Sequence, residues 1–327
     1  MYDVITIGSA TRDVFLKSKD FLVVSSKNIT ERKAICFPLG SKNEIDEVVL
    51  STGGGATNAA VTFARQGFKT ACIARVGSDS FAHNLLLRLK EDKVSTEFIQ
   101  EDKKPETGYS VIVTTPEGSR AILVRRGVSA GIKASEINFK KVSARWLYIT
   151  SLAGNLTLLS KLLNYAKKNN IKVALDPGTK ELRAGIRKLG PLLKKVDFLK
   201  MNQDEAAMLL GIDFKKEKEI FKKLSKLTGG IVAMTKGSGG VVVSDGENIY
   251  SAGVPKSPII ERTGAGDAFG SGFLSAILRG KDVSDAIVLG TANSTSVIQY
   301  YSAKTGILKK GSLGKYPKVK VSIKKYN

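Results

Sequence analysis

The chain is poor in the residues that build disulfide frameworks, zinc sites and histidine-based catalytic triads. Its 327 residues include two cysteines, Cys36 and Cys72, and one histidine, His83. These numbers exclude a disulfide-dense scaffold and a Cys/His zinc centre, and they argue against a His-dependent nucleophile. His83 lies in the helical pattern SFAHNLLLRLKED, where we expect it to pack or to face solvent.

Long apolar runs are also missing. No stretch reaches the roughly 18 consecutive apolar residues of a membrane-spanning helix. The first residues, MYDVITIGSATRD, have the pattern of a strand and a loop and lack the basic and apolar regions of a signal peptide. Hydrophobic residues make up 42% of the chain, enough for a large core. We therefore expect a cytoplasmic globular protein in which residues 1–327 form one α/β domain.

Acidic residues are scarce, and none follows Asp285. Lysine and arginine number 52 against 30 aspartate and glutamate, which gives a formal net charge of +22. Such a field attracts nucleic acids, acidic membranes or small polyanions. Patterns such as LSKLLNYAKKNN, however, place the lysines between apolar residues at helical spacing, which is typical of solvated helix faces. No nucleic-acid-binding motif accompanies them, so we expect neither a specific nucleic-acid partner nor a membrane partner.

Apolar, β-branched runs alternate with helical patterns along most of the chain. Strands are predicted at DVITIG, KTACIARVG, RWLYIT, IKVALDPG, VDFLKMN and GIVAMTKG, with helices such as NLTLLSKLLNYAKKNN and DEAAMLLG between them. This alternation indicates a mostly parallel sheet covered by helices. A hairpin in VVVSDGENIYSAG, turning at Asp245 and Gly246, is predicted to end the sheet.

Two segments interrupt this alternation. FLVVSSKNITERKAICFPLGSKNEIDEVVL lacks helical periodicity, and GYSVIVTTPEGSRAILVRRG has the pattern of a hairpin that turns at Pro116-Glu117-Gly118. Together they predict a small β-layer inserted in the domain, at approximately 14–50 and 107–127. An unpaired strand at its edge would favour a homodimer through this layer.

Glycines gather at the predicted start of a helix in IERTGAGDAFGSGF, residues 260–273. Gly264, Ala265 and Gly266 leave their amides bare, and a helix start with bare amides binds anions. Asp267 follows in the first turn, where an acid can serve the helix dipole alone. That explanation leaves the glycines unexplained. Amides that bind a phosphoryl group, beside a carboxylate that accepts a hydroxyl proton, explain both features.

A second glycine turn, Gly53 to Gly55 in STGGGATNAAVTFARQGFKT, also precedes a predicted helix, with Asn58 in its first turn. The amide of Asn58 donates and accepts hydrogen bonds, which suits a polyhydroxyl ligand. Taken alone, such a turn is more often structural. No Walker A or dinucleotide fingerprint occurs in the chain, so other phosphate-binding enzymes on a doubly wound sheet are disfavoured.

GGGATNAAVTFARQG and ERTGAGDAFGSGFLSAIL resemble the two signature regions of the ribokinase-like (PfkB) family of carbohydrate and nucleoside kinases, in the family's order and spacing. The likeness extends to ITIGSATRD, ARVGSDSFA, LKMNQDEAAMLLG and MTKGSGGVVV, and so to nearly the whole chain. It implies a three-layer α/β/α fold whose β-layer is a substrate lid. It also implies ATP, Mg²⁺ and a small sugar or nucleoside phosphorylated on a hydroxymethyl group.

The resemblance also implies roles for individual residues. Asp267 would be the base, with the amides of Gly264, Ala265 and Gly266 as the anion hole. Substrate contacts would come from Asp13, Gly53, Gly54 and Asn58. Nucleotide contacts would come from Asn202, Glu205, Thr235, Gly237 and Asn293, with Glu205 holding Mg²⁺ through water. Simpler alternatives are that Asp13 forms a turn and that Asn202 and Glu205 form a helix capping box.

One departure from the family concerns Glu261 and Arg262, which stand where Asp-Thr is usual. In potassium-activated members that region contributes to a monovalent cation site. We hypothesise that Arg262 supplies a fixed charge and lowers the dependence on K⁺.

The sequence leaves the identity of the phosphoryl acceptor open. The segment FPLGSKNEIDEV suggests a nucleoside, whereas Arg125 and Arg126 suit a phosphorylated or acidic sugar. The alternative to a kinase is a protein of another class, namely a basic nucleic-acid-binding or regulatory protein built on an inactive kinase fold.

Overall fold

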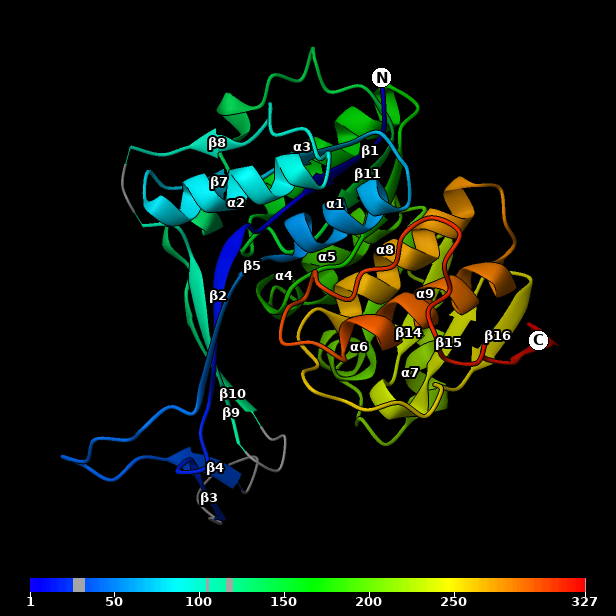
Figure 1. Cartoon of the computed structure of the whole chain (residues 1–327). Coiled ribbons are helices and arrows are strands. Elements are labelled where there is room, and N and C mark those ends of the chain that lie inside the picture. Colours follow the sequence, from blue (N-terminus) through cyan, green and yellow to red (C-terminus); the bar gives the residue numbers. More distant parts are fainter. Residues whose placement is uncertain (26–32, 104–105, 116–119, 327) are drawn as a thin grey trace.

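A mostly parallel sheet forms the central layer of the protein (Figure 1). The computed structural model describes residues 1–25, 33–103, 106–115 and 120–326. The strands of the main sheet are β1 (Tyr2–Ile7), β6 (Thr70–Ile73), β11 (Ala144–Ile149), β12 (Lys172–Leu175), β13 (Phe198–Asn202), β14 (Ile231–Thr235), β15 (Val241–Ser244), β16 (Asn248–Ala252) and β17 (Val321–Lys325). Their order is β17-β16-β15-β14-β13-β12-β11-β1-β6. Neighbours from β6 to β14 run parallel, and β15, β16 and β17 continue the sheet antiparallel.

Helices cover both faces because the strands send apolar side chains to both sides. In β11, Trp146 and Tyr148 join one core cluster, while Leu147 and Ile149 join the other. The first face is covered by α1 (Gly55–Arg65), α8 (Ala265–Leu278) and α9 (Val283–Val297). The second is covered by α3 (Leu156–Lys168), α4 (Thr179–Arg183), α5 (Ile186–Leu193), α6 (Gln203–Leu210) and α7 (Glu217–Leu224). The predicted three-layer α/β/α fold is therefore confirmed.

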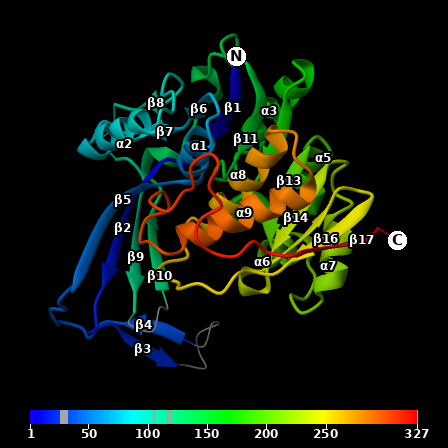
Figure 2. The same ribbon diagram turned by 45° about the vertical axis from the view of Figure 1, so that its right-hand side comes forward.

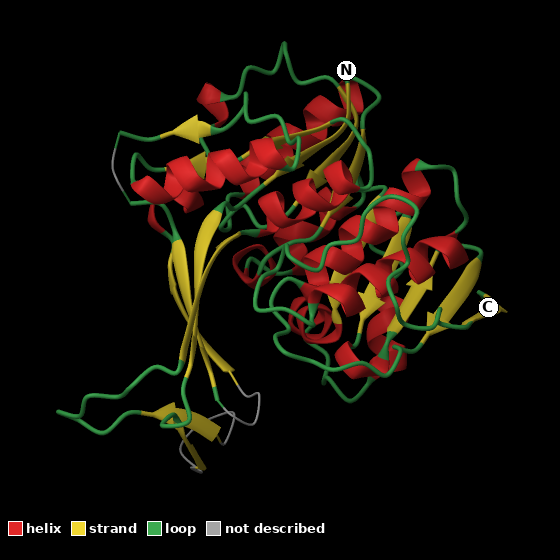
Figure 3. Ribbon diagram, in the orientation of Figure 1, coloured by secondary structure: helices red, strands yellow, loops and turns green. Residues whose placement is uncertain are grey.

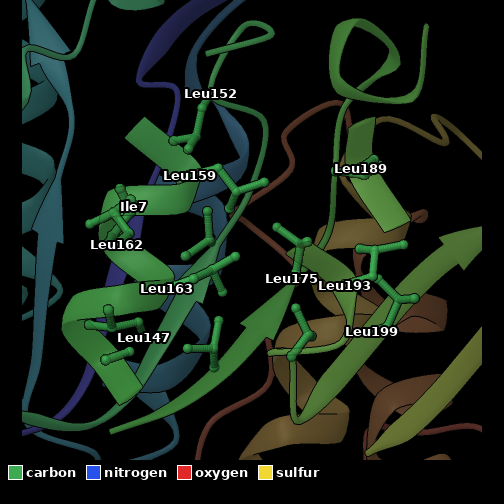
Figure 4. Close-up of a cluster of buried hydrophobic side chains, with 14 of the residues drawn as sticks. Ile7, Leu147, Leu152, Leu159, Leu162, Leu163, Leu175, Leu189, Leu193 and Leu199 are labelled. Atoms are coloured by element: carbon green, nitrogen blue, oxygen red, sulfur yellow. The ribbon is translucent and has the colours of Figure 1, made fainter. Parts of the chain in front are cut away.

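Leucines fill the second face (Figure 4). Those of α3 and α5 pack against those of the strands beneath, and all are at most 2% exposed: Leu147, Leu159, Leu162, Leu163, Leu175, Leu189, Leu193 and Leu199. Each side chain buried in this way stabilises the fold by about 1.5–3 kcal/mol relative to exposure. The leucine spacing that predicts α3 from the sequence is thus the spacing that attaches it to the sheet.

A second, smaller sheet projects from this body (Figures 1 and 3). Its strands are β2 (Thr11–Lys17), β5 (Glu47–Gly53), β9 (Tyr109–Thr114) and β10 (Arg120–Arg125), in the order β10-β9-β2-β5. A hairpin of β3 (Leu22–Ser25) and β4 (Lys33–Cys36) lies at its far end. We call β2, β5, β9 and β10 the projecting sheet. Strands β9 and β10 pair antiparallel as the hairpin pattern predicts, although the proposed Pro116-Glu117-Gly118 turn lies outside the described residues.

The other elements include α2 (Ser80–Glu91), which packs beside β6, and the short strands β7 (Arg75–Val76) and β8 (Gln100–Glu101). Three short 3-10 helices are η1 (Gly127–Ala130), η2 (Ala134–Glu136) and η3 (Gly237–Gly239). No helix in the described part of the chain has both the length and the apolar character needed to cross a bilayer.

The main sheet does not end at the β15–β16 hairpin, contrary to the prediction from sequence. The lysine-rich C-terminal segment passes α9 and adds β17 to the edge, with Ile323 opposite Tyr250 (Figure 2). In this segment, Val321 and Ile323 alternate with polar residues, a pattern typical of a strand, and in β17 Ile323 is 56% exposed. The high lysine content masked that signal.

Candidate active site

The two glycine-rich helix starts meet at Asp267. Helix α1 begins after Gly54 and α8 begins after Gly264, and both glycines have positive φ, 96° and 83°. Asn58 Nδ2 donates a hydrogen bond of 2.8 Å to Asp267 Oδ2. A Cβ added to Gly55 would lie 3.3 Å from Asp267 Oδ1. Residues separated by 209 positions in sequence are thus in direct contact, and the carboxylate stands at two helix N-termini.

A pocket of about 270 Å³ opens above Asp267. Its lining from the main body includes Gly54, Gly55, Asn58, Ser151 and Thr263. The projecting sheet supplies the opposite wall with Asp13, Ser110, Ile112, Ile122 and Val124, all on one face of that sheet because Ser110 is the register neighbour of both Asp13 and Val124. Sequence reasoning identifies Asp13 but misses the other four, since only the strand register shows which face they share.

The two arginines at the end of β10, Arg125 and Arg126, lie in different surroundings. Arg126 lines the pocket, whereas Arg125 forms an exposed ion pair with Glu106. An arginine on the wall of a pocket can receive an anionic group of a ligand. Of the two residues that the sequence analysis names, Arg126 alone is placed to do so.

Asp13 is an unusually buried carboxylate, with 4% of its surface exposed. Burial raises its pKa, and the charge of Lys304 and hydrogen bonds from Thr11 and Ser110 counteract that rise. A Cβ added to Gly53 would lie 1.9 Å from Asp13 Oδ2. Gly53 is therefore a glycine because the carboxylate packs against its backbone. Its part in the site is to leave room for Asp13.

The start of α8 leaves backbone amides available for an anion. Ala265 N donates to Arg262 O over 3.2 Å, so that amide is engaged in a turn. Within the described residues, the amides of Gly264 and Gly266 have no such acceptor. Of the three amides predicted to form the anion hole, these two are the free ones.

A buried lysine stands behind these amides and was not found from the sequence. Lys200 Nζ would lie 2.8 Å from a Cβ added to Gly266, and it forms a 2.9 Å ion pair with Asp176. Burial opposes its charge, but the nearby carboxylates of Asp176, Glu205 and Asp267 outweigh that effect and raise the pKa of Lys200 above its ordinary value. Lys200 thus keeps a positive charge at the base of the helix start.

The predicted nucleotide residues lie mostly at the carboxyl ends of neighbouring strands. Asn202 ends β13 and is the register partner of Thr235, which ends β14, and Gly237 follows at φ 55°. Asn202 and Glu205 also form a capping box, with bonds of 2.8 and 2.9 Å, as the simpler alternative predicts. This box engages Asn202 Oδ1 and Glu205 Oε2.

The chain has no ready-made metal cage in its described part. Glu205 Oε1 makes no hydrogen bond within those residues, and one carboxylate fits Mg²⁺, which keeps several waters and takes phosphate oxygens as its other ligands.

Asn293 lies inside the packed interior of the protein. It is fully buried, its Nδ2 donates to Ala268 O over 2.9 Å, and its Oδ1 accepts from Leu308 N over 2.9 Å. The amide ties α9 to α8 and to the C-terminal segment, so its predicted contact with a nucleotide is not supported. Other residues of α9, including Thr291, Ala292 and Ser296, line a separate pocket of about 210 Å³ beneath the C-terminal segment.

Glu261 is buried and meets the guanidinium of Arg120, which comes from the projecting sheet. It also accepts bonds from Thr263 Oγ1 at 2.9 Å and Thr114 Oγ1 at 3.3 Å. The side chain of Arg262, which the hypothesis names as the fixed charge, is exposed. The guanidinium that meets Glu261 is that of Arg120, 141 residues away in sequence.

Known proteins resemble this chain in sequence and in fold. The pattern of the pfkB family carbohydrate kinases matches residues 3–310. An uncharacterised sugar kinase of Archaeoglobus fulgidus is 31% identical over 249 residues, which are 74% of this chain and 96% of that protein. An ATP-dependent 6-phosphofructokinase of Thermoanaerobacterium thermosaccharolyticum is 25% identical over 315 residues, 92% of this chain and 89% of that protein. The structure of Arabidopsis thaliana ribokinase complexed with ribose and ATP matches in fold, with a TM-score of 0.76 at 20% identity over 96% of this chain and 97% of that one.

Proposed function

We propose that this chain, which belongs to the pfkB family of carbohydrate kinases, transfers a phosphoryl group from ATP to a hydroxymethyl group of a small sugar or nucleoside. The observation that carries the proposal is the position of Asp267. Its carboxylate lies at the floor of the 270 Å³ pocket, in the first turn of α8 and within 2.8 Å of Asn58 Nδ2. A carboxylate, a polar pocket and a helix N-terminus are thereby combined in one place.

In this mechanism Asp267 orients the acceptor hydroxyl and takes its proton. The negative charge of the transferred group spreads over its oxygens and is stabilised by the free amides of Gly264 and Gly266. The ammonium of Lys200, directly behind Gly266, adds a fixed positive charge to the same region. These groups are held by packed helices and strands, so little reorganisation is needed during transfer.

Asp13 and Asn58 are the proposed ligands of the acceptor. Asn58 donates through Nδ2 to Asp267, but its buried Oδ1 has no hydrogen-bond partner among the described residues. A buried acceptor without a partner is costly, and a hydroxyl of the substrate would satisfy it. The carboxylate of Asp13 accepts from a second hydroxyl, while Gly54 lets the backbone approach the ligand.

Asn202, Glu205, Thr235 and Gly237 are the proposed nucleotide side of the site. When bound, Mg²⁺ would supply positive charge to the phosphates, with Glu205 as its protein ligand through water. The pocket beside α9 is proposed to bind the adenine of ATP. Thr291 and Ala292 line this pocket, whereas Asn293 is buried.

The projecting sheet is proposed to act as a lid. Ile112, Ile122 and Val124 form an apolar wall over the pocket. Such a wall excludes water that would otherwise hydrolyse ATP.

A phosphorylated or acidic sugar is the second candidate for the acceptor. Arg126 on the pocket wall supports it, since a guanidinium binds phosphate or carboxylate with paired hydrogen bonds. The similarity to a 6-phosphofructokinase over 92% of the chain supports it as well.

The direct test is ADP release from Mg-ATP with ribose, fructose, several nucleosides and fructose phosphates. We expect turnover with at least one acceptor and its loss in Asp267→Asn. A phosphorylated acceptor whose KM rises in Arg126→Met would favour the second candidate. Folded protein that releases no ADP with any acceptor of the panel would contradict the proposal.

The contacts of Glu261 predict activity without a requirement for K⁺. Its oxygens already accept from Arg120, from two threonine hydroxyls and from backbone amides, so the carboxylate does not fit a monovalent cation. We expect equal rates in sodium and potassium buffers. In Arg120→Met the carboxylate loses its counter-charge, and we expect slower turnover that K⁺ restores in part. Arg125→Met, which removes an exposed pair, is the control. Strong activation of the wild type by K⁺ would contradict this prediction.

A homodimer through the projecting sheet is also proposed. The face turned away from the pocket carries a row of register neighbours, Leu123, Val111, Val14 and Leu50, and Leu123 and Leu50 are 62% and 57% exposed. Val111 and Val14, between the two leucines, are half-buried. An apolar face of this kind supports an interface. Sedimentation should show a dimer that Leu123→Glu converts to monomer. A wild-type monomer at high concentration would refute the dimer.

A further inference from the structure

The loop after α9 touches both glycine-rich helix starts. Ser302 Oγ lies 2.8 Å from Ser51 Oγ in β5. A Cβ added to Gly264 would lie 2.4 Å from the Cβ of Ala303, so the loop packs directly against the start of α8. The next residue, Lys304, turns in the other direction, towards the start of α1.

Lys304 is buried, with 7% of its surface exposed. Its Nζ donates to Thr52 O at 2.7 Å, to Thr57 Oγ1 at 2.9 Å and to Thr52 Oγ1 at 3.2 Å. In the described part of the chain no carboxylate lies within 4.0 Å of this ammonium. Buried lysines are normally paired with an acid, so its position requires another explanation.

The groups bonded to Lys304 belong to the proposed substrate turn. Thr52 precedes Gly53 and Gly54, and Thr57 Oγ1 donates in turn to Gly53 O over 2.7 Å. The three bonds of the ammonium match its three protons. They fix the backbone on both sides of the turn that faces the pocket.

Charged and titratable groups surround Lys304 on several elements. They are Asp13 on β2, Cys72 on β6, Asp92 after α2, Asp267 on α8 and Arg65 on α1, whose Nη1 donates to Lys304 O. Burial lowers the pKa of Lys304 to about 8, and the acidic neighbours counteract that effect. Burial raises the pKa of Cys72 to about 11, so this thiol stays neutral near pH 7.

We propose that Lys304 is a positioning residue that holds the substrate turn in place and supplies the positive charge that keeps Asp13 ionised. This inference rests on the proposed function, because it assigns the turn and Asp13 to acceptor binding. The Lys304 ammonium acts on Asp13 through the electrostatic field and on the turn through hydrogen bonds. Charge and hydrogen bonding therefore make separable contributions.

Two variants separate these contributions. Lys304→Gln keeps a donor without the charge, and Lys304→Met removes both. In the pH profile of kcat/KM for the acceptor, we expect the acidic limb to move to higher pH in both variants, by roughly one unit, since a single nearby charge shifts a carboxyl by about that much. Lys304→Met should also raise the acceptor KM roughly tenfold or more, because it removes hydrogen bonds from a charged donor.

Lys309→Met, an exposed lysine of the same segment, is the matched control and should match the wild type. An acidic limb and acceptor KM unchanged in both Lys304 variants of an active enzyme would overturn the proposal. A raised KM with an unmoved acidic limb in both variants would also overturn it, since Lys304 would then be only a structural tie.

Thermal unfolding between pH 7 and 11 tests the buried charge without any kinase assay. The folded pKa of Lys304, about 8, is below its ordinary 10.5. Between these values the unfolded chain holds a proton that the folded chain has lost, so this group makes stability rise with pH. We expect the melting temperature of the wild type to rise relative to that of Lys304→Met across this range, and Lys309→Met to follow the wild type.

Parallel melting curves for the wild type and Lys304→Met would show that Lys304 loses its proton over the same pH range in the folded and the unfolded chain. That result would exclude a desolvated ammonium at this position and overturn the proposal. If the wild type shows no turnover with any acceptor of the panel, the proposed function fails. The unfolding measurement still decides whether the ammonium of Lys304 is desolvated in the folded chain.

Discussion

Asp267→Asn should bind ATP with nearly unchanged affinity and lose turnover almost completely. Asparagine has the same shape as aspartate and can present its carbonyl oxygen to Asn58 Nδ2, which now donates to Asp267 Oδ2 over 2.8 Å. It cannot accept the proton of the acceptor hydroxyl. General-base catalysis contributes roughly 10²–10⁴ in rate, so we expect a loss of kcat of that order. Single-turnover kinetics and calorimetric titration with ATP measure the two effects separately.

A matched control addresses the simpler role of Asp267 as a first-turn acid that favours the helix dipole. Asp204 is also a first-turn acid, in α6, and its side chain is exposed. Loss of a dipole interaction costs about 0.3–1 kcal/mol in either helix. Asp204→Asn should therefore keep full turnover. Turnover in Asp267→Asn near the wild-type rate would exclude Asp267 as the base.

The fold is largely predictable from sequence because its signals are local. Apolar, β-branched runs in the strands and a period of 3.6 in helices such as α3 give the elements, and their alternation gives a parallel sheet. The edge strand β17 is the exception. Its pairing with β16 joins residues about 70 positions apart in sequence. The lysines there indicate a solvated tail more strongly than Val321 and Ile323 indicate a strand.

The position of the candidate site is predictable where a glycine or a short motif marks it, as at Gly54, Gly264 and Asp267. It is not predictable where a side chain acts across the fold. Lys200 extends from β13 to Gly266 at the start of α8, 66 positions later in the sequence. Lys304 donates a hydrogen bond to Thr52, which lies 252 positions earlier in the sequence. Nothing local distinguishes these two lysines from the many exposed ones.

Asn293 shows the opposite case. The resemblance to a family predicts that Asn293 contacts a nucleotide. Helix α9 does border a pocket, but the rotation of α9 about its axis decides which side chains face that pocket. That rotation is set by packing against α8. The side chain of Asn293 consequently points inward, to Ala268 and Leu308, while Thr291 and Ala292 line the pocket.

Gly264→Ala should be the second most damaging single change. Gly264 has a φ of 83°, a conformation that costs a non-glycine residue about 1–3 kcal/mol. Its new Cβ would also lie 2.4 Å from the Cβ of Ala303, closer than two carbon atoms can approach. The turn must move, and with it the amides of Gly264 and Gly266. Loss of one such donor costs roughly 10²–10³ in kcat in comparable anion holes.

Two further variants separate the steric clash from the backbone strain. Gly264→Ala combined with Ala303→Gly removes the clash and keeps the unfavourable φ, so we expect the double variant to recover part of both stability and kcat. Gly253→Ala is the control, because no heavy atom lies within 4 Å of its added Cβ and its φ is not positive. Full recovery in the double variant would assign the damage to contact with the C-terminal loop. Near-wild-type kcat in Gly264→Ala itself would show that these amides do not stabilise the transferred group.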